Sequence, residues 1–142
     1  MPIKEHLVFE GKIYPVASNS FLFKTASQLN PDCPSSQSSL QPSHIIQESA
    51  HREFRDPVLN SVVALASETA VAGYGVLVFA GSRAACESDA RWISRVLSRM
   101  QDTDPATDSR RIDLILELRA LSSGIDPVLE ETIPFGVAFH RK

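Results

Sequence analysis

The chain has 142 residues, 43% of them hydrophobic and 22% charged, which is the composition of one modest globular domain. Its net charge of −3 excludes a general electrostatic attraction to nucleic acid or membranes, so any site for a polyanion has to be local. The polar N-terminus does not resemble a signal peptide, and no apolar run approaches the ~20 residues of a membrane span, so we expect an intracellular protein.

The N-terminal residues predict a β-hairpin followed by a disordered insertion. Residues 6–10 and 12–16 are β-prone runs, with Glu10 and Gly11 at the turn between them. Residues 26–50 are rich in Ser, Pro and Gln, a composition that buries too little apolar surface to offset the entropy lost on folding. Cys33, His44 and His51 lie in or beside this stretch, but their spacing is too irregular for a zinc site. We therefore expect no metal here.

The centre of the chain reads as a strand, a turn and a helix. Residues 75–79 form a short apolar run without charge, which predicts a strand buried on both faces. Gly81, Ser82 and Arg83 form a polar turn, and residues 84–100 carry apolar side chains at helical spacing. Asp56 followed by proline predicts the start of a preceding helix, over residues 57–72.

The C-terminal part predicts two more helices and a second strand. A helix capped by Asp108 or Ser109 should run to residue 121, and Asp126 followed by proline should begin a short helix through Glu131. Residues 135–139 form a second apolar run, which we expect to pair in parallel with residues 75–79. The predicted fold class is α/β: a partial parallel sheet with flanking helices, preceded by a small β-hairpin.

The turn after the first predicted strand is the main candidate site. Ligands of open parallel sheets bind at the carboxyl ends of the strands, where Gly81, Ser82 and Arg83 would lie. The Ser82 hydroxyl and the Arg83 guanidinium could contact a phosphate backbone, or Ser82 could cap the helix while Arg83 is solvated. An arginine face at residues 91, 95 and 99 has the same two interpretations, and the solvated face is favoured.

Four stretches together resemble the second RecA-like lobe of superfamily-two DNA helicases, of the type found in DNA polymerase theta and helicase Q. Residues 2–14 look like the segment that links the two lobes, and Val76-Leu-Val-Phe-Ala-Gly-Ser-Arg83 looks like motif IV. Residues 118–129 resemble the crossover before the next strand, and Ile133-Pro-Phe-Gly-Val-Ala-Phe-His140 resembles the start of a motif that the family continues further.

The resemblance implies a division into three regions: an inter-lobe linker and β-hairpin over residues 1–25, the insertion over residues 26–50, and a truncated second RecA-like lobe over residues 51–142. It also implies that Gly81, Ser82, Arg83 and His140 contact single-stranded DNA in a nuclear enzyme that acts in DNA repair. For His140 the alternative is a frayed terminal histidine without such a contact, and this alternative is favoured because the rest of its motif is missing. In the intact family enzyme, ATP and magnesium bind between this lobe and a first helicase lobe.

This chain lacks the sequence features that the family's ATP chemistry requires. No Gly-x-x-x-x-Gly-Lys-Ser/Thr loop and no Asp-Glu-x-His box occur in it, so we expect no cofactor and no catalytic residue here. A helicase fragment that is inactive alone is therefore the first hypothesis, and a non-catalytic nucleic-acid- or protein-interaction module is the second. A small α/β enzyme using the Gly81-Ser82 turn is a third hypothesis. Exposed strand edges also predict poor solubility.

Overall fold

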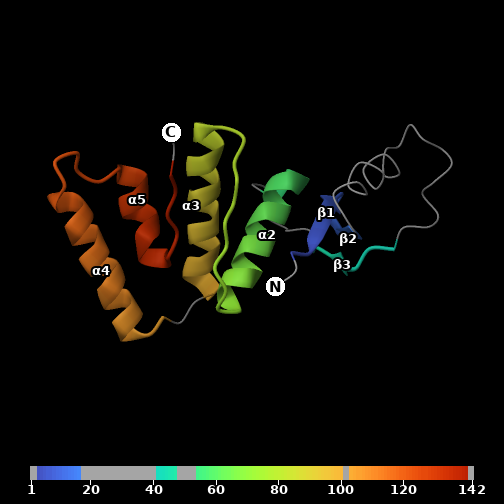
Figure 1. Cartoon of the computed structure of the whole chain (residues 1–142), viewed down its shortest axis with the longest axis horizontal. Helices are drawn as coiled ribbons and strands as arrows, with labels where there is room; N and C mark the ends of the chain where they lie inside the picture. Colours follow the sequence, from blue (N-terminus) through green and yellow to red (C-terminus); the bar gives the residue numbers. More distant parts are fainter. Residues whose placement is uncertain (1–2, 17–40, 48–53, 101–102, 141–142) are drawn as a thin grey trace. The chain divides into compact units, whose positions relative to one another are not determined.

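The computed structural model describes residues 3–16, 41–47, 54–100 and 103–140, which belong to two compact units (Figure 1). The first unit comprises residues 1–61 and the second residues 62–142. The boundary falls inside the helix α2 (Pro57–Val71), so the first turn of this helix belongs to one unit and the remainder to the other.

The first unit contains the predicted hairpin, and a third strand extends it. Strands β1 (Glu5–Phe9) and β2 (Lys12–Val16) pair antiparallel, with Phe9 opposite Lys12. Glu10 and Gly11 have φ angles of 48° and 70°, and positive φ at both central residues is the geometry of the tight turns that match the twist of paired strands. The hairpin prediction is confirmed.

Strand β3 (His44–Ile45) pairs antiparallel with β2, which gives the sheet the order β1-β2-β3. Backbone bonds hold it at both ends, since Ser43 N donates to Ile13 O at 2.8 Å and Ile46 N donates to Gly11 O at 2.6 Å. Ile46 is buried with Tyr14 and Val16. The predicted disorder over residues 26–50 therefore does not hold for residues 43–46, and residues 26–40 and 48–50 lie outside the described part of the chain.

Helix α2 begins as the sequence predicts. The Asp56 carboxylate accepts a hydrogen bond from Val58 N at 2.9 Å, and Pro57 occupies the first helical position. Both features satisfy or remove backbone donors that have no partner inside a helix. The helix ends one residue before the predicted end.

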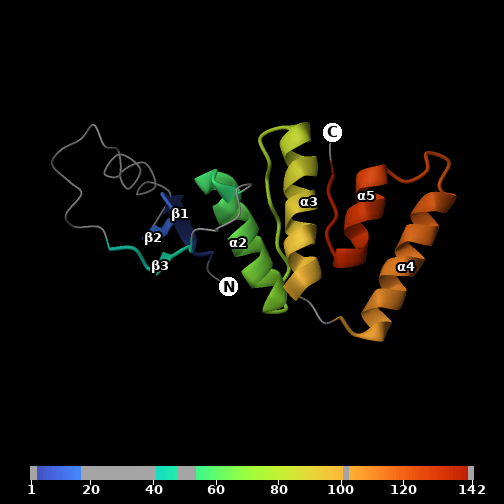
Figure 2. The ribbon, with the colours of Figure 1, turned by 180° about the vertical axis from the view of Figure 1, so that it is seen from behind.

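The second unit is mainly helical, and its helices are α3 (Arg83–Met100), α4 (Pro105–Ala120), α5 (Pro127–Thr132) and the 3-10 turn η2 (Ile133–Phe135). Figure 1 and Figure 2, seen from opposite sides, both place α5 between α3 and α4. The buried side chains on these helices and on α2 form the core of the unit: Val63, Ala66, Ala90, Ile93, Leu97, Val128 and Ile133.

The start of α4 differs from the prediction. The helix begins at Pro105 rather than at Asp108 or Ser109, because Asp104 caps it. The Asp104 carboxylate accepts bonds from Thr107 N at 2.9 Å and from the Thr107 hydroxyl at 2.8 Å. Helix α5 shows the same Asp-Pro pattern and was predicted correctly, with Asp126 accepting from Val128 N at 2.8 Å.

The predicted parallel sheet is not present among the described residues. Residues 75–80 and 137–140 are extended, but neither stretch forms a strand, and η2 occupies the start of the second predicted strand. The prediction that residues 75–79 are buried on both faces is also wrong, since Leu77 is 78% and Phe79 is 89% exposed. A lone extended segment has no neighbouring strand to bond its backbone or cover its side chains. The architecture is therefore mixed α/β with an antiparallel sheet.

Candidate nucleic-acid interface

The candidate turn forms the N-terminal end of α3. Gly81, Ser82 and Arg83 are all exposed, and Arg83 is the first residue of the helix. Ser82 caps the helix, because its hydroxyl oxygen accepts a hydrogen bond from Ala85 N at 3.1 Å. The capping interpretation of Ser82 is thus confirmed. Because the Ser82 hydroxyl acts as the acceptor in this bond, its own hydrogen remains available to donate to another acceptor.

Arg83 lies where a helix favours negative charge. The unpaired N–H groups at a helix N-terminus carry about half a positive charge, so a cation there is unfavourable by a few tenths of a kcal/mol. The first turn of α3 holds no acidic residue that could offset this charge. Arg83 also makes no ion pair with any residue in the described part of the chain. The helix end and the guanidinium therefore place two positive groups at one exposed terminus.

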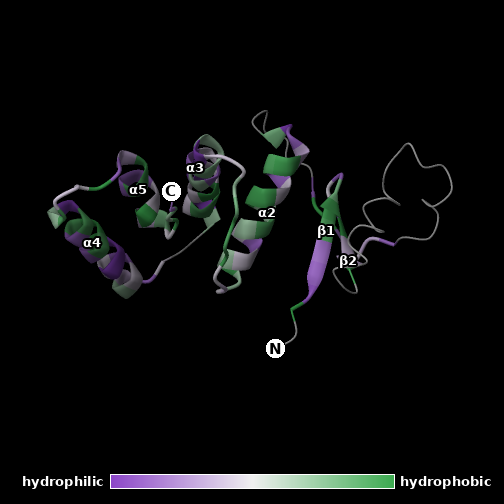
Figure 3. Cartoon of the chain, turned by 45° about the horizontal axis from the view of Figure 1, so that its top comes forward, coloured by the Kyte–Doolittle hydropathy of each residue, from purple (hydrophilic) through white to green (hydrophobic). Residues whose placement is uncertain are grey.

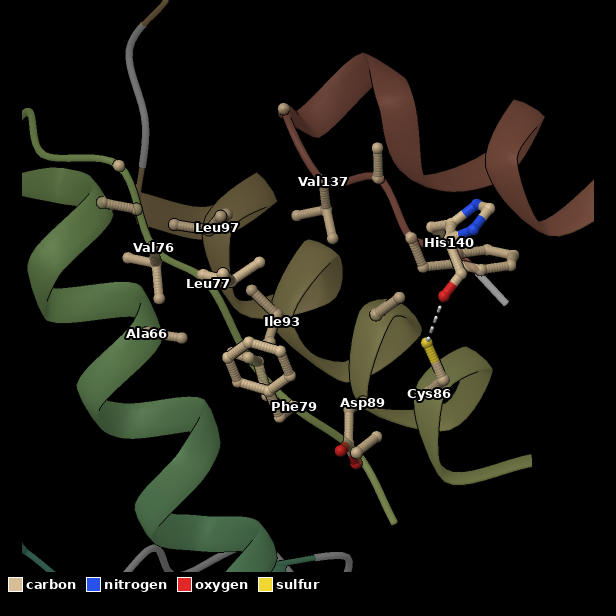
Figure 4. Close-up of a pocket in the computed structure, with 18 of the residues that line it drawn as sticks. Ala66, Val76, Leu77, Phe79, Cys86, Asp89, Ile93, Leu97, Val137 and His140 are labelled. Atoms are coloured by element: carbon tan, nitrogen blue, oxygen red, sulfur yellow. Dashed lines mark hydrogen bonds between the residues drawn. The ribbon is translucent and has the colours of Figure 1, made fainter. Parts of the chain in front are cut away.

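The structure brings His140 to this same end of α3. The Cys86 thiol, one turn into the helix, donates to the backbone oxygen of His140 with a distance of 3.9 Å between sulfur and oxygen (Figure 4). Cys86 N in turn donates to Ser82 O at 2.9 Å. His140 is exposed. The backbone of His140 therefore lies beside Cys86, three residues along α3 from Arg83, although Arg83 and His140 are 57 positions apart in the sequence.

A largely apolar pocket of about 480 Å³ lies beside this terminus, between the two extended segments. Figure 4 shows Ile93 and Leu97 of α3 at its base, the segment with Val76, Leu77 and Phe79 on one side, and Val137 and His140 on the other. Asp89 is the acidic residue in its lining. The sequence reasoning did not find this pocket, because it treated both extended segments as buried strands.

The arginine face of α3 is largely engaged by its own unit. Arg91 forms an ion pair with Glu131 of α5, with 3.2 Å between Nε and Oε2. The Arg95 guanidinium lies 5.0 Å from the centroid of the Trp92 ring, a cation–π geometry. Arg99 lies in the last turn, where a cation suits the helix dipole. This agrees with a solvated, partly paired face rather than a phosphate track.

No group of His, Cys, Asp and Glu side chains in the described residues is arranged to hold a metal ion. The sequence also lacks the glycine-rich loop that cradles nucleotide phosphates. Cys86 is a free, half-buried thiol, while Cys33 lies outside the described part. Across the same residues, no helix combines the length and the apolarity needed to span a bilayer.

No protein-family model matches the chain. The chain is 30% identical over 141 residues to a human protein named Helicase POLQ-like. The alignment covers 98% of this chain but 11% of the human protein. The chain thus spans about a tenth of the length of this relative. The similarity indicates a distant relationship to a helicase-like protein.

Proposed function

We propose that this chain corresponds to part of the second motor lobe of a theta-type DNA helicase, and that it binds single-stranded nucleic acid at the N-terminal end of α3. The relative's name and the four matching stretches support this assignment. A role in nuclear DNA repair belongs to the same proposal. ATP hydrolysis by this chain alone is not part of it, because the sequence contains no Gly-x-x-x-x-Gly-Lys-Ser/Thr loop.

The observation that carries the proposal is the exposed N-terminal end of α3 with Ser82 and Arg83, one turn from the point where Cys86 bonds the backbone oxygen of His140. A phosphate oxygen is a suitable ligand for this end, because helix N-termini, guanidinium groups and hydroxyl donors all favour anions. A bound phosphate would also offset the unfavourable placement of Arg83. The pocket beside the terminus gives the ligand an apolar neighbour, against which a base could lie.

Arg83→Gln and Arg99→Gln together form a matched test. Both substitutions remove one charge from α3 while keeping a long polar side chain, and the two positions are separated by 16 residues, or about 24 Å of helix. Binding of a fluorescent oligothymidine to the full chain is measured by anisotropy at several salt concentrations. Arg83→Gln should weaken binding by about 3- to 10-fold, and should reduce the slope of log K against log salt by about 0.7, the value of one phosphate contact on a single strand.

Arg99→Gln should leave both quantities within twofold of the unmodified chain. Arg83→Gln should not lower the stability of the protein, because removing a cation from a helix N-terminus is neutral or slightly favourable. Equal effects of the two substitutions would instead assign binding to the arginine face, and an unchanged affinity for Arg83→Gln would reject the proposed site.

A second function, as a protein-interaction module, is favoured by a separate observation. Tyr74, Leu77 and Phe79 are 71%, 78% and 89% exposed, which is unusual for large apolar side chains so close in sequence. Such a module would act without nucleic acid, so its activity would be insensitive to Arg83→Gln.

A further inference from the structure

Residues 75–80, the extended segment between α2 and α3, make no backbone–backbone hydrogen bond within the part of the chain that the structure describes. On either side of the segment, Tyr74 N donates to Thr69 O at 3.2 Å and Cys86 N donates to Ser82 O at 2.9 Å. Between these bonds, no backbone N–H or C=O of residues 75–80 bonds to another described residue. An extended stretch with open donors and acceptors is a template for strand pairing.

The side chains of this segment alternate as they do in a strand. Leu77 and Phe79 are highly exposed, whereas Val76 is 43% exposed and Val78 and Ala80 are half-buried. Figure 3 shows most of the segment in the colour of hydrophobic residues. It contains no charge and no proline, and three of its six residues, Val76, Val78 and Phe79, are β-branched or aromatic. This composition favours strand pairing strongly.

From these features we infer that residues 75–80 pair with the same residues of a second copy of the chain, as two antiparallel strands related by a twofold axis. The segment is uncharged, so bringing two copies together creates no repulsion along it. With the axis at Val78, Leu77 lies opposite the partner's Phe79, and Phe79 lies opposite the partner's Leu77. Aromatic and aliphatic cross-strand pairs of this kind stabilise antiparallel sheets.

The exposed area is consistent with a weak dimer. An aromatic side chain carries about 150–250 Å² of surface, so Tyr74 and Phe79, at 71% and 89% exposure, expose roughly 300 Å² in each copy. If all of this surface were covered, two copies would bury at most roughly 600 Å² from these residues, and Leu77 and Val76 raise this upper limit toward the ~1,000 Å² at which specific interfaces begin. We expect a dissociation constant on the order of 10–100 μM.

Sedimentation velocity over a range of concentrations tests the dimer with the full 142-residue chain. Leu77→Lys should raise the dissociation constant at least about tenfold, because it replaces the aliphatic side chain opposite the partner's Phe79 with a charge and puts two like charges on one face of the strand pair. Leu116→Lys is the matched control, since Leu116 is also exposed, at 54%, but lies on α4. It should change the constant less than about twofold.

Amide hydrogen exchange distinguishes strand pairing from non-specific hydrophobic association. With Val78 and the partner's Val78 as a hydrogen-bonded pair, only the amides of Val76, Val78 and Ala80 face the partner strand. These three amides should exchange about tenfold more slowly above the dissociation constant than below it. Val78→Pro removes a donor that has no partner in the monomer, and should abolish both this protection and the dimer while leaving the far-UV circular dichroism of the dilute protein unchanged.

Three results would overturn the inference. These are a monomer at concentrations up to about 1 mM, equal weakening by Leu77→Lys and Leu116→Lys, or a dimer in which the amides of Val76, Val78 and Ala80 remain unprotected. A dimer that survives Val78→Pro would assign the association to another surface. None of these results depends on Arg83, so the dimer and the nucleic-acid site can fail independently.

Discussion

Two buried serines allow a direct measurement of what an unbonded hydroxyl costs in this protein. Ser67 in α2 and Ser94 in α3 are each 2% exposed, and both lie inside helices. The Ser94 hydroxyl donates to Arg91 O at 2.8 Å, whereas the Ser67 hydroxyl has no partner among the described residues. The same substitution, serine to alanine, therefore removes a satisfied group at one position and an unsatisfied group at the other.

The expected magnitudes differ in a defined direction. Alanine gains about 0.5 kcal/mol of helix propensity over serine at both positions. Removing a buried hydroxyl that has no partner raises the free energy of unfolding by about 1–3 kcal/mol. Removing the bonded hydroxyl of Ser94 lowers it by about 0.5–1.5 kcal/mol. Ser67→Ala should thus raise the free energy of unfolding by about 2 kcal/mol, and Ser94→Ala should leave it unchanged or lower it by up to about 1 kcal/mol.

Urea unfolding followed by far-UV circular dichroism measures both changes, provided that the dependence of stability on urea is the same for all three proteins. The experiment is made at low protein concentration to avoid association. If the two substitutions change stability equally, or if Ser67→Ala is the more destabilising one, the Ser67 hydroxyl has a partner in solution and the reasoning fails.

Two further predictions concern the helix cap of α4 and the turn after η2. The hydrogen bonds from the Thr107 hydroxyl and N–H lower the pKa of Asp104 below its ordinary value of 3.8, so the charged cap contributes stability above that value that is lost as the pH falls through the lowered pKa. The midpoint of urea unfolding should fall between pH 7 and about pH 3, and it should fall less for Asp104→Asn than for the unmodified chain. An equal fall in both proteins would contradict the stabilising role of the charged Asp104 cap. Gly136→Ala should lower stability by about 1–2 kcal/mol, because φ is +78° and the added Cβ would lie 2.7 Å from Arg111 Nη2, which must then move. In thermal unfolding, Gly75→Ala is the control, since its Cβ would meet no atom within 4 Å, and an equal loss for both variants would argue against strain at Gly136.

The helices and the hairpin were predictable because their signals are local. Asp56 and Asp126, each followed by proline, mark helix starts through contacts with backbone donors two residues away, and the Glu10-Gly11 turn fixes its hairpin in the same way. The same chemistry at Asp104 was overlooked in favour of Asp108, although the sequence contains the Asp-Pro signal there too. The cap of α3 by Ser82 was one of two interpretations of that residue, and the structure confirms it.

The predicted sheet failed because strand formation depends on a partner that a local pattern does not specify. Residues 75–79 have the composition of a buried strand, yet burial requires neighbouring strands, and none flanks this segment in the described part of the chain. The opposite error occurred at His44–Ile45, where the polar composition predicted disorder but a short strand forms. Pairing with β2 supplies the partner that this strand needs. The meeting of His140 with the first turns of α3 likewise depends on the path of the whole second unit.

The site at the N-terminal end of α3 is the central claim, and amide chemical shifts recorded during titration with an oligothymidine test it most directly. We expect the largest changes at residues 81–85 and at His140, growing with saturation and disappearing at high salt. Changes concentrated on the arginine face of α3 or on α4, or no changes at concentrations that saturate binding by anisotropy, would contradict the claim.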